Sequence, residues 1–274
     1  FIEILKAILF GIVEGITEWL PISSTGHMIL LDEFIHLNVS EEFYKLFEVV
    51  IQLGAILAVV IIYFKTICPW GFGKTKEDTK ETLNLWGKIL VACIPAAIIG
   101  ILFDDWLDEH LYNGIVVALA LIVYGIAFIV IESKNIGSRD TKKLSDITYK
   151  QAVSVGAFQL LSLVPGTSRS GSTILGGLAV GLERSTASKF TFFLAIPVMA
   201  GASLLKLLKY IMKVGFVFNA NELIILGVGC LVSFIVSILV IRFLMNYIRK
   251  HDFKVFGYYR IVLGIIVLLY FFIK

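Results

Sequence analysis

The chain of 274 residues contains little charge. Only 16% of its residues are Asp, Glu, Lys or Arg, and 58% are hydrophobic, against roughly 25% and 45–50% in a typical soluble domain. This balance excludes an ordinary soluble domain and indicates a polytopic membrane protein. The net charge of +3 says little by itself, because most basic residues fall in predicted loops, where they can contact anionic lipid head groups. We expect membrane lipids as neighbours and no nucleic-acid partner.

Cysteine is also scarce. Cys68, Cys93 and Cys230 are scattered along the chain without a CxxC pair or the spacing of metal ligands. We therefore expect three buried free thiols, and neither a disulfide framework nor a zinc site.

The amino-terminal segment lacks the features of a secretory signal peptide. Glu3, Glu14 and Glu18 interrupt its apolar region, and no small-residue cleavage site follows. We expect it to be part of the mature structure.

Long apolar runs are what the sequence has in abundance. Six of them approach the roughly 20 residues that a bilayer requires: Leu46–Thr66, Trp86–Phe103, Leu111–Ile131, Thr186–Met212, Glu222–Met245 and Phe256–Ile273. Two shorter runs, Phe1–Val13 and Gln151–Leu163, meet polar residues and a proline before reaching that length. We predict that each forms a re-entrant helix hairpin, because broken backbone is tolerated at membrane depth where protein buries it. The predicted fold is all-α, a single integral membrane domain over residues 1–274.

The two short runs resemble each other. QAVSVGAFQLLSLVPGTSRSGST, residues 151–173, can be laid on KAILFGIVEGITEWLPISSTGHMI, residues 6–29. The matched positions are Ala7 with Ala152, Gly11 with Gly156, Glu14 with Gln159 and, after a gap of one residue, Pro21 with Pro165 and Ser24 with Ser168. The predicted topology runs the two copies in opposite directions, which indicates an inverted repeat with halves 1–132 and 151–274. Their polar tips should meet near the middle of the membrane.

Basic residues are distributed unevenly between the two predicted faces. One face carries fifteen, namely Lys65, Lys74, Lys76, Lys80, Lys88, Lys134, Arg139, Lys142, Lys143, Lys150, Arg184, Lys189, Arg249, Lys250 and Lys254. The other carries six, namely Lys6, Lys45, Lys206, Lys209, Lys213 and Lys274, while Arg169, Arg242 and Arg260 fall within or at the ends of apolar segments. The positive-inside rule makes the first face cytoplasmic. The acidic segment Asp104–Glu109 is then predicted to be a short outward-facing loop.

Two groups of polar residues interrupt the apolar background. Glu14 and Glu18 are four residues apart, so on a helix they share one face and can converge on one cation or one water. Ionisable residues inside a membrane usually serve function, although these two could instead pair with a lysine or reach the interface. PGTSRSGST, residues 165–173, predicts an anion-binding nest ahead of a helix that begins near Gly171. Arg169 would offer phosphate a planar fork; the alternative is a serine-rich helix cap with an arginine that reaches the interface.

These stretches carry a resemblance that covers essentially the whole chain. EGITEWLPISSTGH and PGTSRSGST, together with FEVVIQLGAILAV and FTFFLAIPVMAGA, resemble the undecaprenyl-diphosphatase family, the bacitracin-resistance phosphatases of bacterial plasma membranes. The resemblance implies hydrolysis of undecaprenyl diphosphate to undecaprenyl phosphate and inorganic phosphate, which recycles the lipid carrier of cell-wall synthesis. It also implies a divalent cation, Mg²⁺ or Ca²⁺, which suits paired carboxylates. The family's motif residues fall on Glu14, Glu18, Ser24, His27, Ser168, Arg169, Ser170 and Thr173.

The chemistry of diphosphate hydrolysis gives each of these residues a role. Negative charge must be neutralised, a nucleophile must stand in line, and the leaving group must be stabilised. We expect Arg169 and neighbouring backbone amides to hold the phosphates, helped by the hydroxyls of Ser168 and Ser170, with Gly166 in the same turn and Thr173 in support. Glu14 and Glu18 would hold the metal or orient water.

A second set of residues is expected to move protons and to support the site. His27 can exchange a proton at neutral pH, or it can be structural. Ser24 is the candidate nucleophile because it lies three residues before His27, within reach across one helical turn; a water activated by a glutamate is the rival. Glu48 and Gln52 form a further polar pair inside a predicted span, where we expect them to support the site.

Other functions fit the sequence less well. The repeat would suit a transporter, including one that flips the lipid phosphate between leaflets, but the set of Glu, Ser, His and Arg is richer than ion coordination requires. The phosphatidate-phosphatase type of enzyme is rejected because no histidine follows Arg169 until His251. A serine intramembrane protease lacks its partner histidine on a late helix. We expect the site to open to the outer face, and a homo-oligomer is compatible with the sequence.

Overall fold

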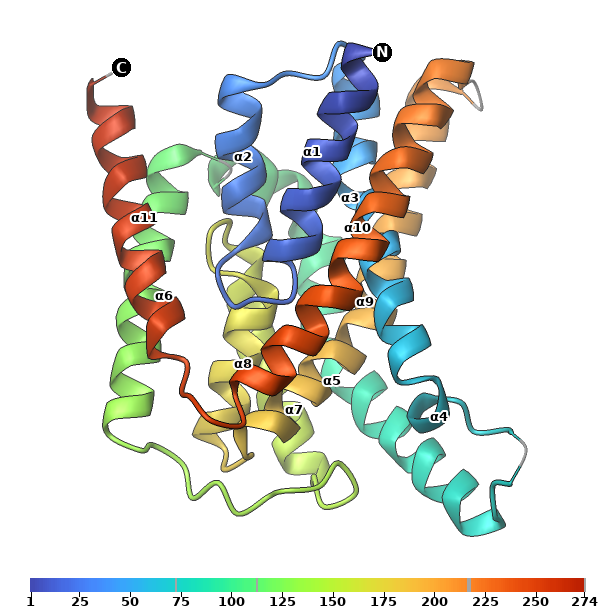
Figure 1. Cartoon of the computed structure of the whole chain (residues 1–274), viewed down its shortest axis with the longest axis vertical. Coiled ribbons are helices and arrows are strands. Elements are labelled where there is room, and N and C mark those ends of the chain that lie inside the picture. Colours follow the sequence, from blue (N-terminus) through green and yellow to red (C-terminus); the bar gives the residue numbers. More distant parts are fainter. Residues whose placement is uncertain (72, 112, 216–217, 274) are drawn as a thin grey trace.

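The computed structural model describes residues 1–71, 73–111, 113–215 and 218–273, and these form an all-helical bundle (Figure 1). The elements are α1 (Ile2–Thr17), α2 (Ser24–Phe34), α3 (Glu41–Ile62), α4 (Phe64–Ile67), α5 (Lys76–Leu111), α6 (Gly114–Ser133), α7 (Tyr149–Gln159), the 3₁₀ turn η1 (Leu160–Leu163), α8 (Arg169–Ala179), α9 (Arg184–Val214), α10 (Ala220–Tyr247) and α11 (Lys254–Ile273). Within the described residues the only β-type contact is an isolated bridge between Thr141 and Leu182.

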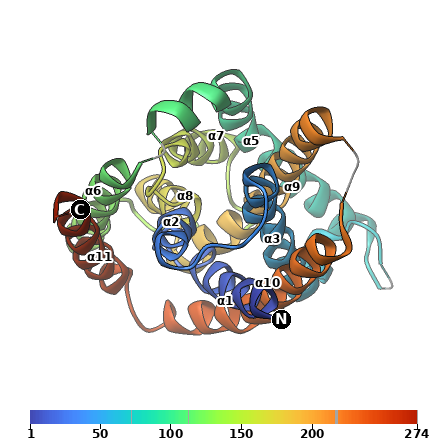
Figure 2. The ribbon, with the colours of Figure 1, turned by 90° about the horizontal axis from the view of Figure 1, so that it is seen from above.

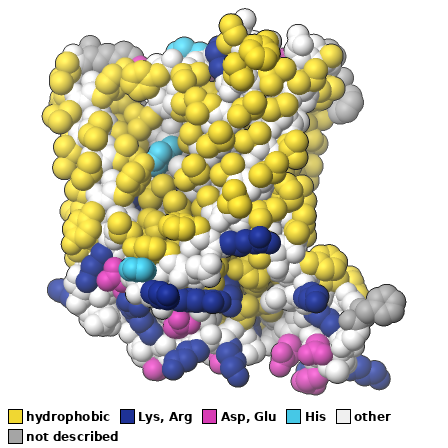
Figure 3. All heavy atoms as spheres, in the orientation of Figure 1, with side chains coloured by type: hydrophobic (Ala, Val, Ile, Leu, Met, Phe, Trp, Pro, Cys, Tyr) yellow, Lys and Arg dark blue, Asp and Glu magenta, His cyan; other side chains and the backbone are white. Residues whose placement is uncertain are grey.

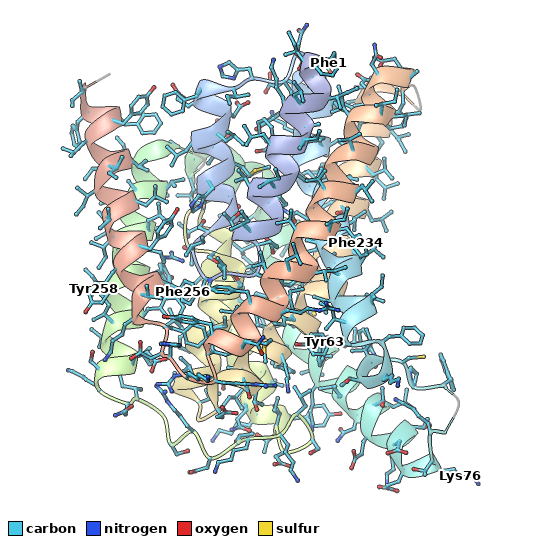
Figure 4. All side chains as sticks on the ribbon, in the orientation of Figure 1. Phe1, Tyr63, Lys76, Phe234, Phe256 and Tyr258 are labelled. Carbon is cyan, nitrogen blue, oxygen red and sulfur yellow. The ribbon has the colours of Figure 1, made fainter. Side chains whose placement is uncertain are left out.

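Within the described ranges, six helices are long and apolar enough to cross a membrane, which confirms the six predicted spans. They are α3, α5, α6, α9, α10 and α11. Figure 3 shows the matching surface, an apolar band that covers most of the molecule's height and ends at a lower face where Lys and Arg gather. Phe1 lies at the upper end of the molecule and Lys76 at the lower end (Figure 4). The chain is therefore a multi-pass membrane protein.

One predicted loop is wrong. The acidic segment Asp104–Glu109 was expected to be a loop, but α5 continues through it to Leu111. No glycine or proline interrupts the segment, and the rings of Trp106 and His110, four residues apart on the helix, stack at 4.7 Å between their centroids. Side-chain stacking at this spacing supports a helix. The side chains of Asp104, Asp105 and Asp108 lie outside the described residues.

Four of the helices, α1, α2, α7 and α8, form two excursions that turn back inside the bundle (Figure 1). Figure 1 shows that α1 descends from the upper end and α2 returns to it, with their connection at mid-height, whereas α7 and α8 make the same excursion from the lower end. Seen from above, α2 and α8 lie near the middle, surrounded by the other helices (Figure 2). The two connections therefore bring the polar motifs of the sequence into the centre of the molecule.

The two connections end in the same local structure. Ser23 caps α2 by accepting a hydrogen bond from the Gly26 amide, and Ser168 caps α8 by accepting one from the Gly171 amide. Both serines have a positive φ, 77° and 75°. Ser23 thus corresponds to Ser168 at the same offset as Glu14 to Gln159. The gap that paired Ser24 with Ser168 is wrong, because the caps place Ser24 opposite Arg169, and α8 begins at Arg169 before the predicted start near Gly171.

Close helix packing surrounds this centre. A Cβ at Gly54 of α3 would overlap the Cys230 carbonyl of α10, so these two backbones touch. Small residues allow such close approach in membrane bundles, where packing replaces the hydrophobic effect between helices. The three cysteines are free thiols, as predicted, but are half-buried.

A buried carboxylate ties the lower end of the bundle together. Glu132, at the end of α6, accepts two hydrogen bonds from Arg184 of α9 at 2.7 and 2.9 Å and one from Arg139 at 2.9 Å. The Phe253 amide, just before α11, also donates to it, at 3.2 Å. One carboxylate therefore fixes the relative positions of α6, α9 and the start of α11.

Candidate active site

The polar motifs line one pocket of about 190 Å³ at the meeting point of the two connections. Its walls are Glu18, Ser24, Thr25, Gln52, Ser162, Val164, Pro165, Gly166, Ser168, Arg169, Val198, Met199 and Ala202. Pockets for drug-sized ligands measure roughly 300–1,000 Å³. The volume therefore suits a small polar group better than a complete lipid.

A chain of hydrogen bonds crosses this pocket. Ser24, the first residue of α2, donates from its Oγ to Glu18 Oε2 at 2.6 Å. Arg169, the first residue of α8, donates from Nη2 to Glu18 Oε1 at 2.6 Å. Glu18 is 6% exposed, so a desolvated carboxylate bridges a hydroxyl and a guanidinium. A nucleophile, a base and a group that orients the base make up the usual constellation of an activated hydroxyl.

Part of the Arg169 guanidinium is already hydrogen-bonded within the protein. Its Nη1 donates to the Thr191 carbonyl at 3.0 Å, and its Nη2 also contacts Met199 Sδ at 3.1 Å. The guanidinium carbon lies 5.8 Å from the centre of the Trp19 ring. Its Nε is buried without a hydrogen-bond partner, which leaves a donor available to a bound anion.

Glu14 lies beside this chain without a hydrogen-bond partner. It is 1% exposed, and neither carboxylate oxygen is hydrogen-bonded. The carboxylates of Glu18 and Glu48 and the guanidinium of Arg169 act on it electrostatically. Buried oxygen atoms left unpaired beside other carboxylates fit the oxygen ligands that Mg²⁺ and Ca²⁺ prefer.

The remaining predicted residues divide into those in the pocket and those behind it. Gly166, Ser168 and Gln52 line the pocket. Ser170 is buried and its Oγ contacts Ser168 Oγ at 3.1 Å. Thr173 is fully buried one turn into α8, where its hydroxyl donates to the Arg169 carbonyl at 2.8 Å and accepts from Thr191 Oγ1 at 2.9 Å. Thr173 therefore supports Arg169 from behind the pocket.

The predicted contact between Ser24 and His27 is replaced by other contacts. The His27 ring contacts the Ser23 carbonyl through Nδ1 and the Tyr259 hydroxyl through Nε2, each at 2.7 Å. Ser24 is turned towards Glu18 instead. The spacing of three residues brought the two side chains to one helix end, but the bend before α2 carries Ser24 back over the end of α1. Tyr259 and His27 also stack, with their ring planes at 3°.

Arg260 is the main residue that sequence reasoning missed. It lies on α11, is fully buried, and donates to the Pro21 carbonyl at 3.1 Å and to the Gly166 and Thr167 carbonyls at 2.8 Å. One guanidinium thus holds both connections. Its place inside an apolar run, where an arginine is costly, was the available signal.

Comparison with known proteins identifies the family of this chain. Residues 7–266 match the family described as bacitracin resistance protein BacA. An undecaprenyl-diphosphatase from Enterococcus faecalis is 59% identical over 98% of this chain and 97% of its own length. One from Desulfitobacterium hafniense is also 59% identical, over 98% and 96%, and undecaprenyl-diphosphatase 1 of Clostridioides difficile is 57% identical over 99% and 97%. This chain therefore belongs to the bacitracin resistance protein BacA family.

Proposed function

We propose that this protein hydrolyses undecaprenyl diphosphate to undecaprenyl phosphate and inorganic phosphate in the bacterial plasma membrane. The observation that carries the proposal is the hydrogen-bonded chain Ser24–Glu18–Arg169 in a polar pocket inside an apolar bundle. The names and near-complete coverage of the relatives support the substrate. Release of this product would recycle the lipid carrier of wall synthesis and confer resistance to bacitracin. Nothing in the comparisons supports the alternative of a pure lipid-phosphate transporter.

The geometry suggests how the reaction runs. The Ser24 hydroxyl gives its proton to Glu18 as its oxygen attacks the terminal phosphorus, and the bond from that phosphorus to the bridging oxygen breaks. Undecaprenyl phosphate leaves, and water then releases inorganic phosphate from Ser24. Arg169 orients Glu18 and can offer its unpartnered Nε to a phosphate oxygen. A water activated by Glu18 is the alternative nucleophile.

The same residues can accommodate a divalent cation. Glu14 and Glu18 would hold it, because the Glu14 oxygens are buried and unpaired beside Glu18. A group of three His, Cys, Asp or Glu side chains with metal-binding geometry is absent from the described part of the chain, and Mg²⁺ commonly takes one or two carboxylates plus substrate phosphates. When bound, the cation would neutralise phosphate charge.

We also propose that the bundle is an inverted repeat with halves 1–132 and 151–274 and two re-entrant hairpins, α1–α2 and α7–η1–α8. The packing supports it, since α1 packs on α10 as α7 packs on α5, and the equivalent helices pair as α3 with α9 and α6 with α11. The matched caps at Ser23 and Ser168 support it as well.

Purified protein should release inorganic phosphate from undecaprenyl diphosphate, and a chelator should abolish the release.

Glu14→Gln and Glu18→Gln should each lower the rate of phosphate release by orders of magnitude and raise the metal concentration needed for half-maximal rate, because each removes an anionic ligand. Absence of phosphate release by the wild type would contradict the function. An unchanged metal requirement in both variants would limit these residues to proton transfer or structure.

Arg169→Lys should be nearly as damaging as Arg169→Ala. An ammonium is a point donor and cannot bridge Glu18, the Thr191 carbonyl and a phosphate oxygen from one plane. Loss of one preorganised donor costs roughly 2–4 kcal/mol, or about a thirtyfold to thousandfold drop in kcat/KM. Thermal stability in detergent should change little in the Lys variant. Near wild-type turnover with Lys would show that only charge matters at this position.

The site should open to the outer face of the membrane, as the distribution of basic residues predicts. In a cysteine-free background, a membrane-impermeant maleimide should label Lys213→Cys on intact cells and Lys142→Cys only after lysis. Both positions are exposed in the structure, so failure to label reflects the membrane and not burial. The reverse pattern would invert the topology.

A further inference from the structure

Arg260 joins the two halves of the active site from behind. Its Nη1 donates to Pro21, in the connection between α1 and α2, and its Nη2 donates to Gly166 and Thr167, in the connection between η1 and α8. Each contact is made to a backbone carbonyl, so the arginine acts on the path of the chain and not on a catalytic side chain. Pro21 lies three residues before Ser24, and Thr167 lies two before Arg169.

The buried charge of Arg260 is stabilised by hydrogen bonds to these carbonyl oxygens. The side chain is fully buried, and in the described part of the chain no Asp or Glu pairs with it. The Tyr124 ring, 5.8 Å from the guanidinium carbon, is a further electron-rich neighbour. A buried cation is costly unless polar groups surround it. The carbonyls of both connections are therefore held towards Arg260.

Fixing these carbonyls also fixes the amides on the opposite side. In a trans peptide the N–H points away from the C=O of the same unit. The Thr167 carbonyl points at Arg260, so the Ser168 amide points away from it, and Ser168 is a wall of the pocket. Ser168 and Ser23 also hold the positive φ angles of 75° and 77°. Such strained backbone persists only where its surroundings over-determine it.

We propose that Arg260 is a positioning residue for the reaction assigned above. It clamps both connections so that Ser24 and Arg169 face each other across Glu18 and the Ser168 amide faces the substrate phosphate. The inference rests on the proposed function, because the clamped groups are those that handle the diphosphate. The proposed role requires more than positive charge, namely a planar donor that reaches carbonyls of both connections at once.

The direct test compares Arg260→Lys and Arg260→Met with Arg242→Lys and Arg242→Met, where Arg242 is an exposed arginine of α10. Phosphate release from undecaprenyl diphosphate is measured well below each variant's melting temperature in detergent. Both Arg260 variants should lose about a hundredfold in kcat, the cost of a small misplacement of reacting groups. KM should change far less, because the clamped Ser168 amide acts on charge that develops in the transition state. The Arg242 variants should match the wild type.

A kcat in Arg260→Lys within about threefold of the wild type would overturn the inference, as would a loss confined to KM. An inactive wild type would contradict the proposed function itself, whereas the clamp is tested by the ratio of each variant's kcat to that of an active wild type.

If the Arg260 variants fail to fold, Gly171→Ala tests the clamp instead. Its new Cβ would lie 3.1 Å from Arg260 Nη1 and 3.2 Å from Ser168 Cβ, so it would press on the contact region between the clamp and the start of α8, whereas a Cβ at Gly201 meets no atom within 4 Å. Gly171→Ala should lower kcat and Gly201→Ala should leave it unchanged; equal kcat values in the two would overturn the clamp.

Discussion

The ion pair between Glu18 and Arg169 is the contact on which the site depends. The two residues are 151 positions apart in the chain, yet their side chains meet at 2.6 Å in the interior of an apolar bundle. Lipid offers neither group a hydrogen bond, so each must find its partner within the protein. Removal of one member of a buried pair typically costs 3–5 kcal/mol, because an uncompensated charge remains. The pair therefore links the position of α1 to that of α8.

The rest of the architecture keeps this contact in place. Four helices end or begin at mid-height, and their exposed backbone groups would be costly in lipid. The caps at Ser23 and Ser168 satisfy amides at the helix starts, and Arg260 satisfies carbonyls of the turns. Close backbone contacts such as that of Gly54 with Cys230 hold the surrounding spans together. The membrane environment therefore requires both hydrogen-bonded polar groups at the centre and tight apolar packing around them.

Much of this could be predicted from the sequence. The six spans follow from apolar runs whose length matches the bilayer, and the importance of Glu18 and Arg169 follows from the cost of charge in such surroundings.

The partner of Ser24 could not be predicted from the sequence. Spacing along one helix suggests His27, whereas the bend at Ser23 turns the Ser24 hydroxyl to Glu18. A positive φ at a serine leaves no sequence signal. The sequence places Arg260 within an apolar segment but does not indicate its four carbonyl partners, because these are defined by the tertiary fold alone. Acidic residues alone indicate a loop at the end of α5, but the segment contains no helix-breaking residue and remains helical.

The central claim is that residues from both connections act as one catalytic unit. A double-mutant cycle on kcat/KM for phosphate release, with Glu18→Gln, Arg169→Gln and the double variant, tests this most directly. If Glu18 and Arg169 work as a unit, the double variant should lose about as much as the more damaging single variant, because the second substitution removes an interaction already lost. Losses that multiply in the double variant would show that the two residues act independently, and would contradict the account.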